Sequence, residues 1–104
     1  MAQFDVYHNP NPDTRKRFPY LLDVQDDMLE VLATRVVVPL MPLTVSSKPM
    51  DRLNPVLDIE GRQFAASVPE LAGVPKSMLG TPVANVATAR DAIIAALDFL
   101  FTGI

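Results

Sequence analysis

The chain contains no cysteine. This absence excludes disulfides, thiolate zinc sites and cysteine nucleophiles together, and it is compatible with a reducing cytoplasm. Histidine is almost absent as well, because His8 is the only one. No nearby carboxylate pattern marks His8 as a general base, so we expect it to be an ordinary surface residue.

The sequence motifs of the common enzyme classes are also missing. There is no GxSxG, GxGxxG or P-loop pattern, so serine hydrolase, dinucleotide-binding and ATPase functions have no support. The acidic residues Asp23, Asp26 and Asp27 lack both the glycine-punctuated spacing of a metal-binding loop and an accompanying histidine pair. We therefore expect no metal and no cofactor, and we predict a binding protein that is not an enzyme.

Basic residues are fewer than acidic ones. Nine Lys and Arg residues against twelve Asp and Glu give a net charge of -3. This argues against nucleic-acid binding by the free protein, which would ordinarily need a basic face. Residues 1–7 alternate instead of forming an apolar signal-peptide core, and Asp98 interrupts the apolar C-terminal segment before it could span a bilayer. We expect a cytoplasmic protein with no membrane contact.

Helical periodicity is present over one long segment, residues 88–104. An apolar stripe recurs there at helical spacing and consists of Ala89, Ile93, Ala96, Leu97 and Leu100. Thr88, followed three residues later by Asp91, predicts a capping-box-like start. Gly103 predicts the stop.

The opposite face of this predicted helix is unusually apolar. It carries Ile94, Ala95 and Phe101 beside Asp91 and Asp98. A helix that is apolar nearly all round is usually buried on more than one side. Because 104 residues make one domain with little surplus core, we expect the second side to meet another subunit or a partner. The alternative is a core helix with a few exposed apolar residues.

Short strands are predicted for the rest of the chain, because ten prolines leave no other window for a long helix. Alternating or β-branched segments predict strands at residues 3–7, 20–25 and 35–40, the first two as a hairpin and the third central to the sheet. The third strand is bounded by Pro39 and Pro42, so its far end is predicted to turn away from the ladder. A further hairpin, with its turn at Glu60-Gly61, is predicted for residues 56–66. Residues 26–34 are a predicted loop with exposed apolar tips at Met28 and Leu29. Residues 45–54 are a second predicted loop, and residues 68–82 a last short strand with brief helical turns. The fold class is mainly β with one C-terminal helix.

The alternation also predicts which side chains are buried. In the first strand Phe4 and Val6 share one face, and Tyr7 lies on the other. In the second strand Asp23 and Gln25 are predicted to point outward.

Several short segments resemble one known family in their order and spacing. They are Gln3-Phe4-Asp5-Val6-Tyr7, Asp23-Val24-Gln25 followed by Asp27, Arg35-Val36-Val37-Val38-Pro39-Leu40, Pro55-Val56-Leu57-Asp58-Ile59, Val74-Pro75 with Gly80, and Phe101-Thr102-Gly103-Ile104. On these segments the chain resembles, from end to end, the CcdB toxins of plasmid-maintenance toxin–antitoxin modules.

The resemblance implies one domain over residues 1–104, an SH3-like barrel with a small additional antiparallel sheet and a C-terminal helix, assembled as a homodimer. It implies the toxin of a type II toxin–antitoxin system that binds the DNA gyrase A subunit and traps the cleaved gyrase–DNA complex. A CcdA-like antitoxin would neutralise it. The resemblance also implies a part in transcription regulation, with DNA contacted only through the toxin–antitoxin complex.

The resemblance further places two partner surfaces on this sequence. The gyrase-binding residues would be Met28, Leu29, Asp98, Thr102, Gly103 and Ile104, with Phe101 as a further apolar residue of the same tip. The antitoxin-binding residues would lie in the loop after the first strand and include Asn9, Asn11, Asp13, Arg15, Lys16 and Arg17. The basic run in this loop would suit an acidic tail, although such a run is also ordinary in a solvated loop.

Two departures from the family leave alternatives open. The best-known member has tryptophan where this chain has Thr102 and asparagine where it has Asp98. Since large aromatic anchors often dominate an interface, one alternative is an inactive homologue that binds antitoxin but no longer poisons gyrase. The other is an endoribonuclease toxin of similar fold, which the acidic charge and the lone His8 disfavour.

Overall fold

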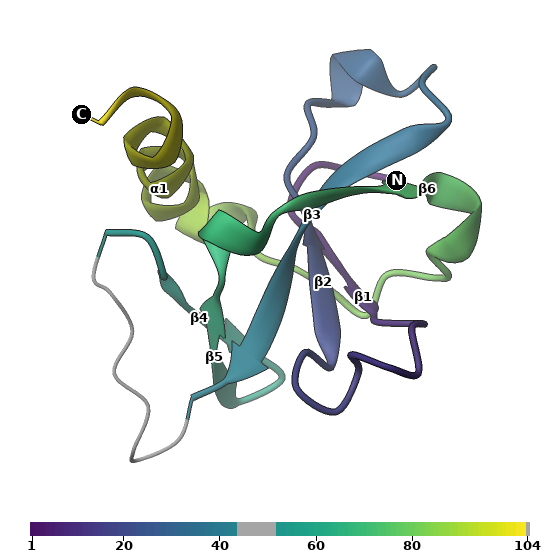
Figure 1. The fold of residues 1–104 in the computed structure, drawn as a ribbon, viewed down its shortest axis with the longest axis horizontal. Helices are drawn as coiled ribbons and strands as arrows, with labels where there is room; N and C mark the ends of the chain where they lie inside the picture. Colours follow the sequence, from purple (N-terminus) through teal and green to yellow (C-terminus); the bar gives the residue numbers. More distant parts are fainter. Residues whose placement is uncertain (44–51, 104) are drawn as a thin grey trace.

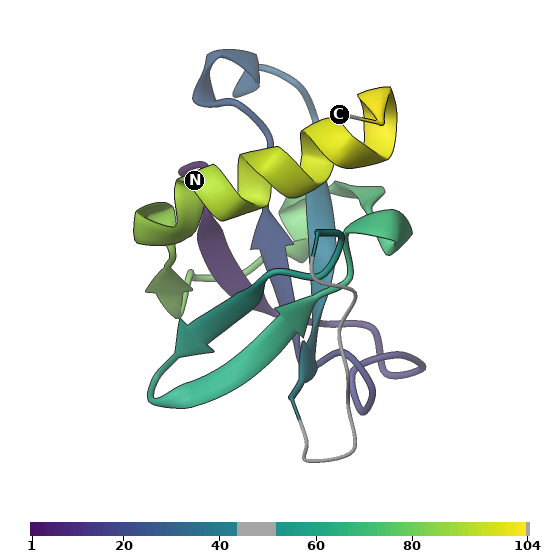
Figure 2. The ribbon, with the colours of Figure 1, turned by 90° about the vertical axis from the view of Figure 1, so that its left-hand side faces the viewer.

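The computed structural model describes residues 1–43 and 52–103, which form a strongly curved, barrel-like antiparallel sheet with an α-helix lying across it (Figure 1, Figure 2). The strands are β1 (Asp5–His8), β2 (Tyr20–Asp23), β3 (Thr34–Pro42), β4 (Val56–Ile59), β5 (Arg62–Ala66), β6 (Ala72–Pro75) and β7 (Ala84–Asn85). The helical elements are the short 3₁₀ helices η1 (Asp27–Leu29), η2 (Val68–Glu70), η3 (Lys76–Met78) and η4 (Ala87–Ala89), and the α-helix α1 (Arg90–Thr102). The prediction of a mainly β fold with a C-terminal helix is confirmed.

Strand β3 is central to the sheet, as predicted. It pairs with β2 along one edge. Along the other edge, residues 34–37 pair with β6 and residues 40–42 pair with β5. The prediction that β3 turns away near Pro39 was wrong. The Pro39 carbonyl accepts a hydrogen bond from the Ser67 N–H at 2.9 Å, so the proline nitrogen faces the gap between β6 and β5, where no strand needs a donor.

The predicted hairpin between the first two strands is confirmed, because β1 and β2 pair antiparallel with Val6 opposite Leu22. Strand β1 begins at Asp5 and not at Gln3, because the backbone φ of Phe4 is 71°, outside the β region. Residues 45–51 of the predicted second loop lie outside the described residues. In the described part of the chain, no helix is long and apolar enough to cross a membrane.

Helix α1 packs on the main core through the predicted stripe. Ile93 and Ala96 are fully buried. The other stripe residues, Ala89, Leu97 and Leu100, are partly buried against the same core. Ile94 also packs there, so its predicted place on the outer face was wrong. The buried face of α1 is therefore wider than the predicted stripe.

The end of α1 was predicted correctly, but its start was not. Gly103 adopts φ 73° and its N–H donates to the Phe99 carbonyl, which makes it the left-handed C-cap. At the start, the N-cap residue is Ala89 and no side chain caps the helix, so Thr88 does not form the predicted capping box. Helix η4 precedes α1 directly, and the Asn85 side chain accepts the first N–H of η4 at 2.9 Å.

The predicted hairpin turn at Glu60-Gly61 joins β4 and β5. Both turn residues have positive φ, 53° for Glu60 and 82° for Gly61, which is the type I′ geometry that matches the twist of a two-residue hairpin. The expected small additional sheet corresponds to this hairpin, which is hydrogen-bonded to β3 and so belongs to the same sheet.

We expect the substitution Gly61→Ala to destabilise the protein by about 1 kcal/mol, because a Cβ at this backbone conformation is strained. No atom lies within 4 Å of the added Cβ, so the cost isolates the backbone. Gly80→Ala is the matched control, since its Cβ also meets nothing within 4 Å and its φ is not positive. Urea unfolding of both variants measures the difference, and equal stabilities would contradict the turn assignment.

Candidate functional site

The η1 loop, residues 26–33, projects four large apolar side chains into solvent. Met28 is 88% exposed and Val31 89%, while Leu29 and Leu32 are about half exposed. The predicted exposure of Met28 and Leu29 is confirmed. Val31 and Leu32 were missed, although the loss of alternation around them was a sequence signal of a loop. Contiguous exposed apolar side chains mark interaction surfaces more often than isolated ones do.

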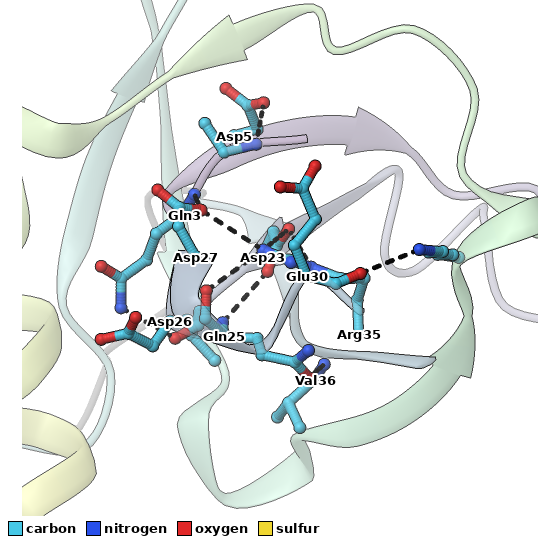
Figure 3. A network of polar contacts seen from close by, with 12 residues as sticks. Gln3, Asp5, Asp23, Gln25, Asp26, Asp27, Glu30, Arg35 and Val36 are labelled. Atoms are coloured by element: carbon cyan, nitrogen blue, oxygen red, sulfur yellow. Dashed lines mark hydrogen bonds and ion pairs between the residues drawn. The ribbon is translucent and has the colours of Figure 1, made fainter. Parts of the chain in front are cut away.

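The side chain of Gln25 holds the middle of the η1 loop and the residue that follows its end. Its Nε2 donates to the Leu29 carbonyl at 3.3 Å and to the Thr34 carbonyl at 3.0 Å. Its Oε1 accepts from the Val36 N–H at 3.1 Å, as Figure 3 shows. The loop backbone is therefore fixed from inside, while its apolar side chains remain outside.

Three further hydrogen bonds hold the η1 loop in place. The Asp26 side chain accepts from the Met28 N–H at 2.8 Å, and Asp27 Oδ1 accepts from the backbone N–H of Gln3 at 2.7 Å. Across the loop, Lys76 Nζ donates to the carbonyl of Glu30 at 2.9 Å. One of these bonds closes the start of the loop on itself, and the other two join the loop to Gln3 near the N-terminus and to Lys76 of η3.

Beneath the η1 loop lies a buried ion pair (Figure 3). The Arg35 guanidinium is fully buried and donates from Nε and Nη2 to Asp23 Oδ2, at 2.8 Å and 2.7 Å. Its Nη2 also donates to the Gln25 carbonyl at 3.1 Å and lies 3.8 Å from Asp27 Oδ1. Arg35 Nη1 is buried without a hydrogen-bond partner. This network connects the end of β2 to the start of β3 and to the η1 loop.

The prediction that Asp23 and Gln25 point outward was wrong, since both are buried. The strand face that was expected to meet water is covered by a second apolar cluster. In that cluster Tyr7 is fully buried and packs with Leu79 and Val74, which come from η3 and β6. Alternation along a strand identifies two faces, but it does not reveal that a distant segment covers the second one.

Burial shifts the titration of two groups on this face. Burial and, to a smaller extent, the nearby carboxylates of Asp5 and Asp23 together raise the pKa of Tyr7 to about 12, while the Arg35 guanidinium acts in the opposite direction. Burial also raises the pKa of Asp23, and hydrogen bonds from Arg35 and from the Gln25 N–H oppose this rise. Within residues 1–43 and 52–103, no three His, Asp or Glu side chains are grouped so as to hold a metal.

The C-terminal end of α1 is the second exposed apolar feature. Phe101 is 70% exposed, and Asp98, Thr102 and Gly103 are also exposed. The Thr102 hydroxyl donates to the Asp98 carbonyl one turn back at 2.6 Å. Ile104 lies outside the described residues. Both ribbon views place this helix end and the η1 loop at the upper side of the molecule (Figure 1, Figure 2), so the two elements that carry the predicted gyrase-binding residues other than Ile104 lie on one side.

The predicted antitoxin-binding residues lie in the connection between β1 and β2. Asn9 is buried, and its Nδ2 donates to Thr14 Oγ1 and to the Phe18 carbonyl. Its Oδ1 accepts from the Asn11 N–H, so Asn9 organises the loop from within. The remaining predicted residues are exposed, namely Asn11, Asp13, Arg15, Lys16 and Arg17.

Taken together, these features define a small β-rich protein that presents rigid apolar and basic surfaces to partners. A sequence model of the family described as CcdB protein matches residues 3–103. The chain therefore belongs to the CcdB family. CcdB proteins are toxins of toxin–antitoxin systems that poison DNA gyrase and are not themselves enzymes, and membership supports a role of this general kind.

The raised pKa of Tyr7 predicts a loss of stability at high pH. The unfolded chain releases the phenol proton near the ordinary tyrosine pKa of 10.0, whereas the folded state holds it until about pH 12. The contribution of Tyr7 is therefore complete below pH 10 and is lost as the pH rises through 12, by on the order of 2 kcal/mol. Tyr7→Phe should remove this part of the decline, which urea unfolding between pH 9 and pH 12 measures. Parallel declines in both proteins would contradict the prediction.

Proposed function

We propose that this protein is the toxin of a type II toxin–antitoxin system that binds the DNA gyrase A subunit and traps the cleaved gyrase–DNA complex. A cognate CcdA-like antitoxin neutralises it, and the resulting complex carries the contact with DNA and the transcriptional regulation. The observation that carries this proposal is the presentation of the η1 loop and the helix tip on one side of a CcdB-family fold.

The rigidity of the η1 loop supports its role as the gyrase contact. Binding through a mobile loop loses free energy to ordering, whereas a preorganised loop avoids this loss. The Gln25 side chain and the buried Arg35 network supply that preorganisation. Val31 and Leu32 enlarge the apolar surface beyond Met28 and Leu29, which supports gyrase binding without a tryptophan at the helix tip.

An RNA-cleaving function has less support. His8 is exposed, and its ring stacks on that of Tyr20 with the ring centroids 5.2 Å apart. Such a stack holds the imidazole against an aromatic ring and not against a carboxylate, which a general base would use for orientation. The net charge of -3 also disfavours an RNA-binding groove.

We infer that the toxin is a homodimer. Helix α1 leaves Ala92 and Ala95 exposed on one side, and an isologous contact would bury equivalent apolar faces of two copies. Sedimentation at micromolar concentration should give twice the 11.4 kDa mass of the chain. Ala95→Asp, which places a charge on this face, should shift the equilibrium toward monomer. A wild-type protein that sediments only as monomer would rule the dimer out.

The exposed apolar residues should govern gyrase inhibition. Met28→Ser and Phe101→Ser should each weaken inhibition of supercoiling by about tenfold, because each removes a desolvated apolar contact. Thr102→Trp should strengthen it by adding an aromatic anchor at an exposed position. Supercoiling by purified gyrase, with trapped cleavage complexes scored on the same gels, measures both effects.

The matched control is Met78→Ser, because Met78 is a half-exposed methionine that belongs neither to the η1 loop nor to the helix tip. It should leave inhibition unchanged. If the wild type does not inhibit gyrase at all while Thr102→Trp does, the chain is the inactive homologue that the sequence left open. Equal effects of the Met28 and Met78 substitutions would remove the η1 loop from the gyrase contact.

A further inference from the structure

Met28 is the most exposed methionine in the described part of the chain. It is 88% exposed, against 50% for Met78 and 41% for Met1, and Met41 is only partly exposed. The fifth methionine, Met50, lies outside the described residues. The chain contains neither cysteine nor tryptophan, so no thiol competes with the thioethers for a mild oxidant. Among the described residues, a peroxide in solution therefore has the freest access to Met28.

The side chain of Met28 belongs to a surface of four exposed apolar side chains. The other three are those of Leu29, Val31 and Leu32 in the same η1 loop. The Met28 N–H donates to the Asp26 side chain at 2.8 Å, so the backbone holds the thioether at this surface. A chemical change at Met28 therefore alters the polarity of a surface that is otherwise apolar.

Oxidation of a thioether by hydrogen peroxide is a balanced two-electron reaction. The sulfur attacks one peroxide oxygen, an S–O bond forms as the O–O bond breaks, and the second oxygen takes up a proton and leaves as water. The sulfur loses two electrons and the peroxide gains them. The product, methionine sulfoxide, is polar and accepts hydrogen bonds, whereas the thioether is apolar.

The fold does not depend on the Met28 thioether. No residue of η1 is buried, and the hydrogen bonds that hold the η1 loop come from its backbone and from the side chains of Gln25, Asp26, Asp27 and Lys76. A sulfoxide in a core disrupts packing, but a sulfoxide at this position remains in solvent. Oxidation of Met28 therefore changes the surface and leaves the fold intact.

We propose that Met28 is a site of reversible oxidation by peroxide, which switches the η1 loop from an apolar to a polar partner surface. The reverse step is the reduction of the sulfoxide by thiol-dependent methionine sulfoxide reductases, in which the S–O bond breaks, the thiols supply two electrons and the oxygen leaves as water. The oxidation itself is independent of the proposed function. Its consequence rests on that function, in which the oxidised toxin binds gyrase more weakly.

The rate of sulfoxide formation tests the site directly. The wild-type protein is treated with hydrogen peroxide at neutral pH, and mass spectrometry of its peptides follows each methionine. Met28 should be oxidised at least about twofold faster than Met78, in line with its greater exposure. The melting temperature should fall by less than about 4 °C, as for other surface changes. Equal rates at Met28 and Met78, or loss of the folded state with oxidation of Met28, would overturn the proposal.

Retention of the native protein on a phenyl matrix measures the switch in polarity without any partner. Oxidation should lower the retention of the wild type, and the two reductases, one for each sulfoxide epimer, should restore it. Met28→Leu carries an apolar side chain of similar volume that peroxide does not oxidise, so its retention should stay constant. Met28→Gln, which is polar from the start, should elute early before any oxidation. Equal losses of retention by the wild type and Met28→Leu would show that other methionines are responsible and would refute the switch.

Gyrase inhibition tests the functional consequence, with each protein compared before and after oxidation. The oxidised wild type should inhibit supercoiling about tenfold more weakly than the reduced wild type, because a desolvated apolar contact is lost. Met28→Leu should keep its own starting level of inhibition after peroxide. Met78→Leu is the matched control, because Met78 is the next most exposed methionine of the described residues, and it should lose inhibition as the wild type does. Full inhibition by a wild type whose Met28 is oxidised would refute the consequence for gyrase.

The oxidation rates and the inhibition assay separate this proposal from the proposed function. Inhibition of gyrase by the wild type without preferential oxidation of Met28 would refute the oxidation site and leave the toxin function intact. Preferential and reversible oxidation with loss of retention, in a protein that does not inhibit gyrase, would support the oxidation site and refute the toxin function.

Discussion

The buried ion pair between Arg35 and Asp23 is the constraint on which the side of the molecule with the η1 loop depends. Removing two charges from water costs several kcal/mol for each ion, and the mutual attraction offsets this only when further hydrogen bonds satisfy both groups. Asp23 receives the Gln25 N–H at 3.0 Å in addition to the guanidinium, and Arg35 donates to the Gln25 carbonyl. The ion pair therefore fixes the end of β2, the start of β3 and Gln25 in one position relative to one another.

That arrangement has two structural consequences. Burial of the ion pair requires a cover over the second face of the sheet, which β6 and η3 provide, and the apolar cluster of Tyr7, Leu79 and Val74 forms beside it. The cover ends before it reaches the loop that follows β1. A cavity of about 280 Å³ lies between this loop and the segment formed by β6 and η3. The same network anchors Gln25, whose amide fixes the η1 loop. One set of buried polar contacts thus positions an exposed apolar loop without help from a large core.

A protein of the CcdB family acts through the surfaces that it presents. The η1 loop and the end of α1 are apolar and face one side, whereas the basic run lies in a different loop, which Asn9 organises. Under the proposed function, these separate surfaces serve two partners of different chemistry, one recognised through apolar contacts and one through positive charge. The small domain can present both surfaces because its tertiary contacts fix the loops, although the loops themselves contain little regular structure.

Local features of the fold followed from the sequence, because they depend on neighbouring residues. The helical stripe around Ile93, the left-handed stop at Gly103 and the turn at Glu60-Gly61 are set by side-chain spacing and backbone sterics, and each was predicted correctly. The sequence also predicted the exposure of Met28 and Leu29 and the membership of the CcdB family.

Long-range contacts decided the rest. Asp23 and Gln25 are buried because a segment some fifty residues later in the chain covers their face of the sheet, and no local pattern encodes that cover. Thr88 does not cap α1, because it lies inside η4, the 3₁₀ helix that directly precedes α1. The cavity exists only where β2, β3, β6, η3 and a loop meet in space. The sequence by itself determined the elements and their ends, and the tertiary structure alone decided which polar groups lie inside and which surfaces remain open, because burial depends on partners that are distant along the chain.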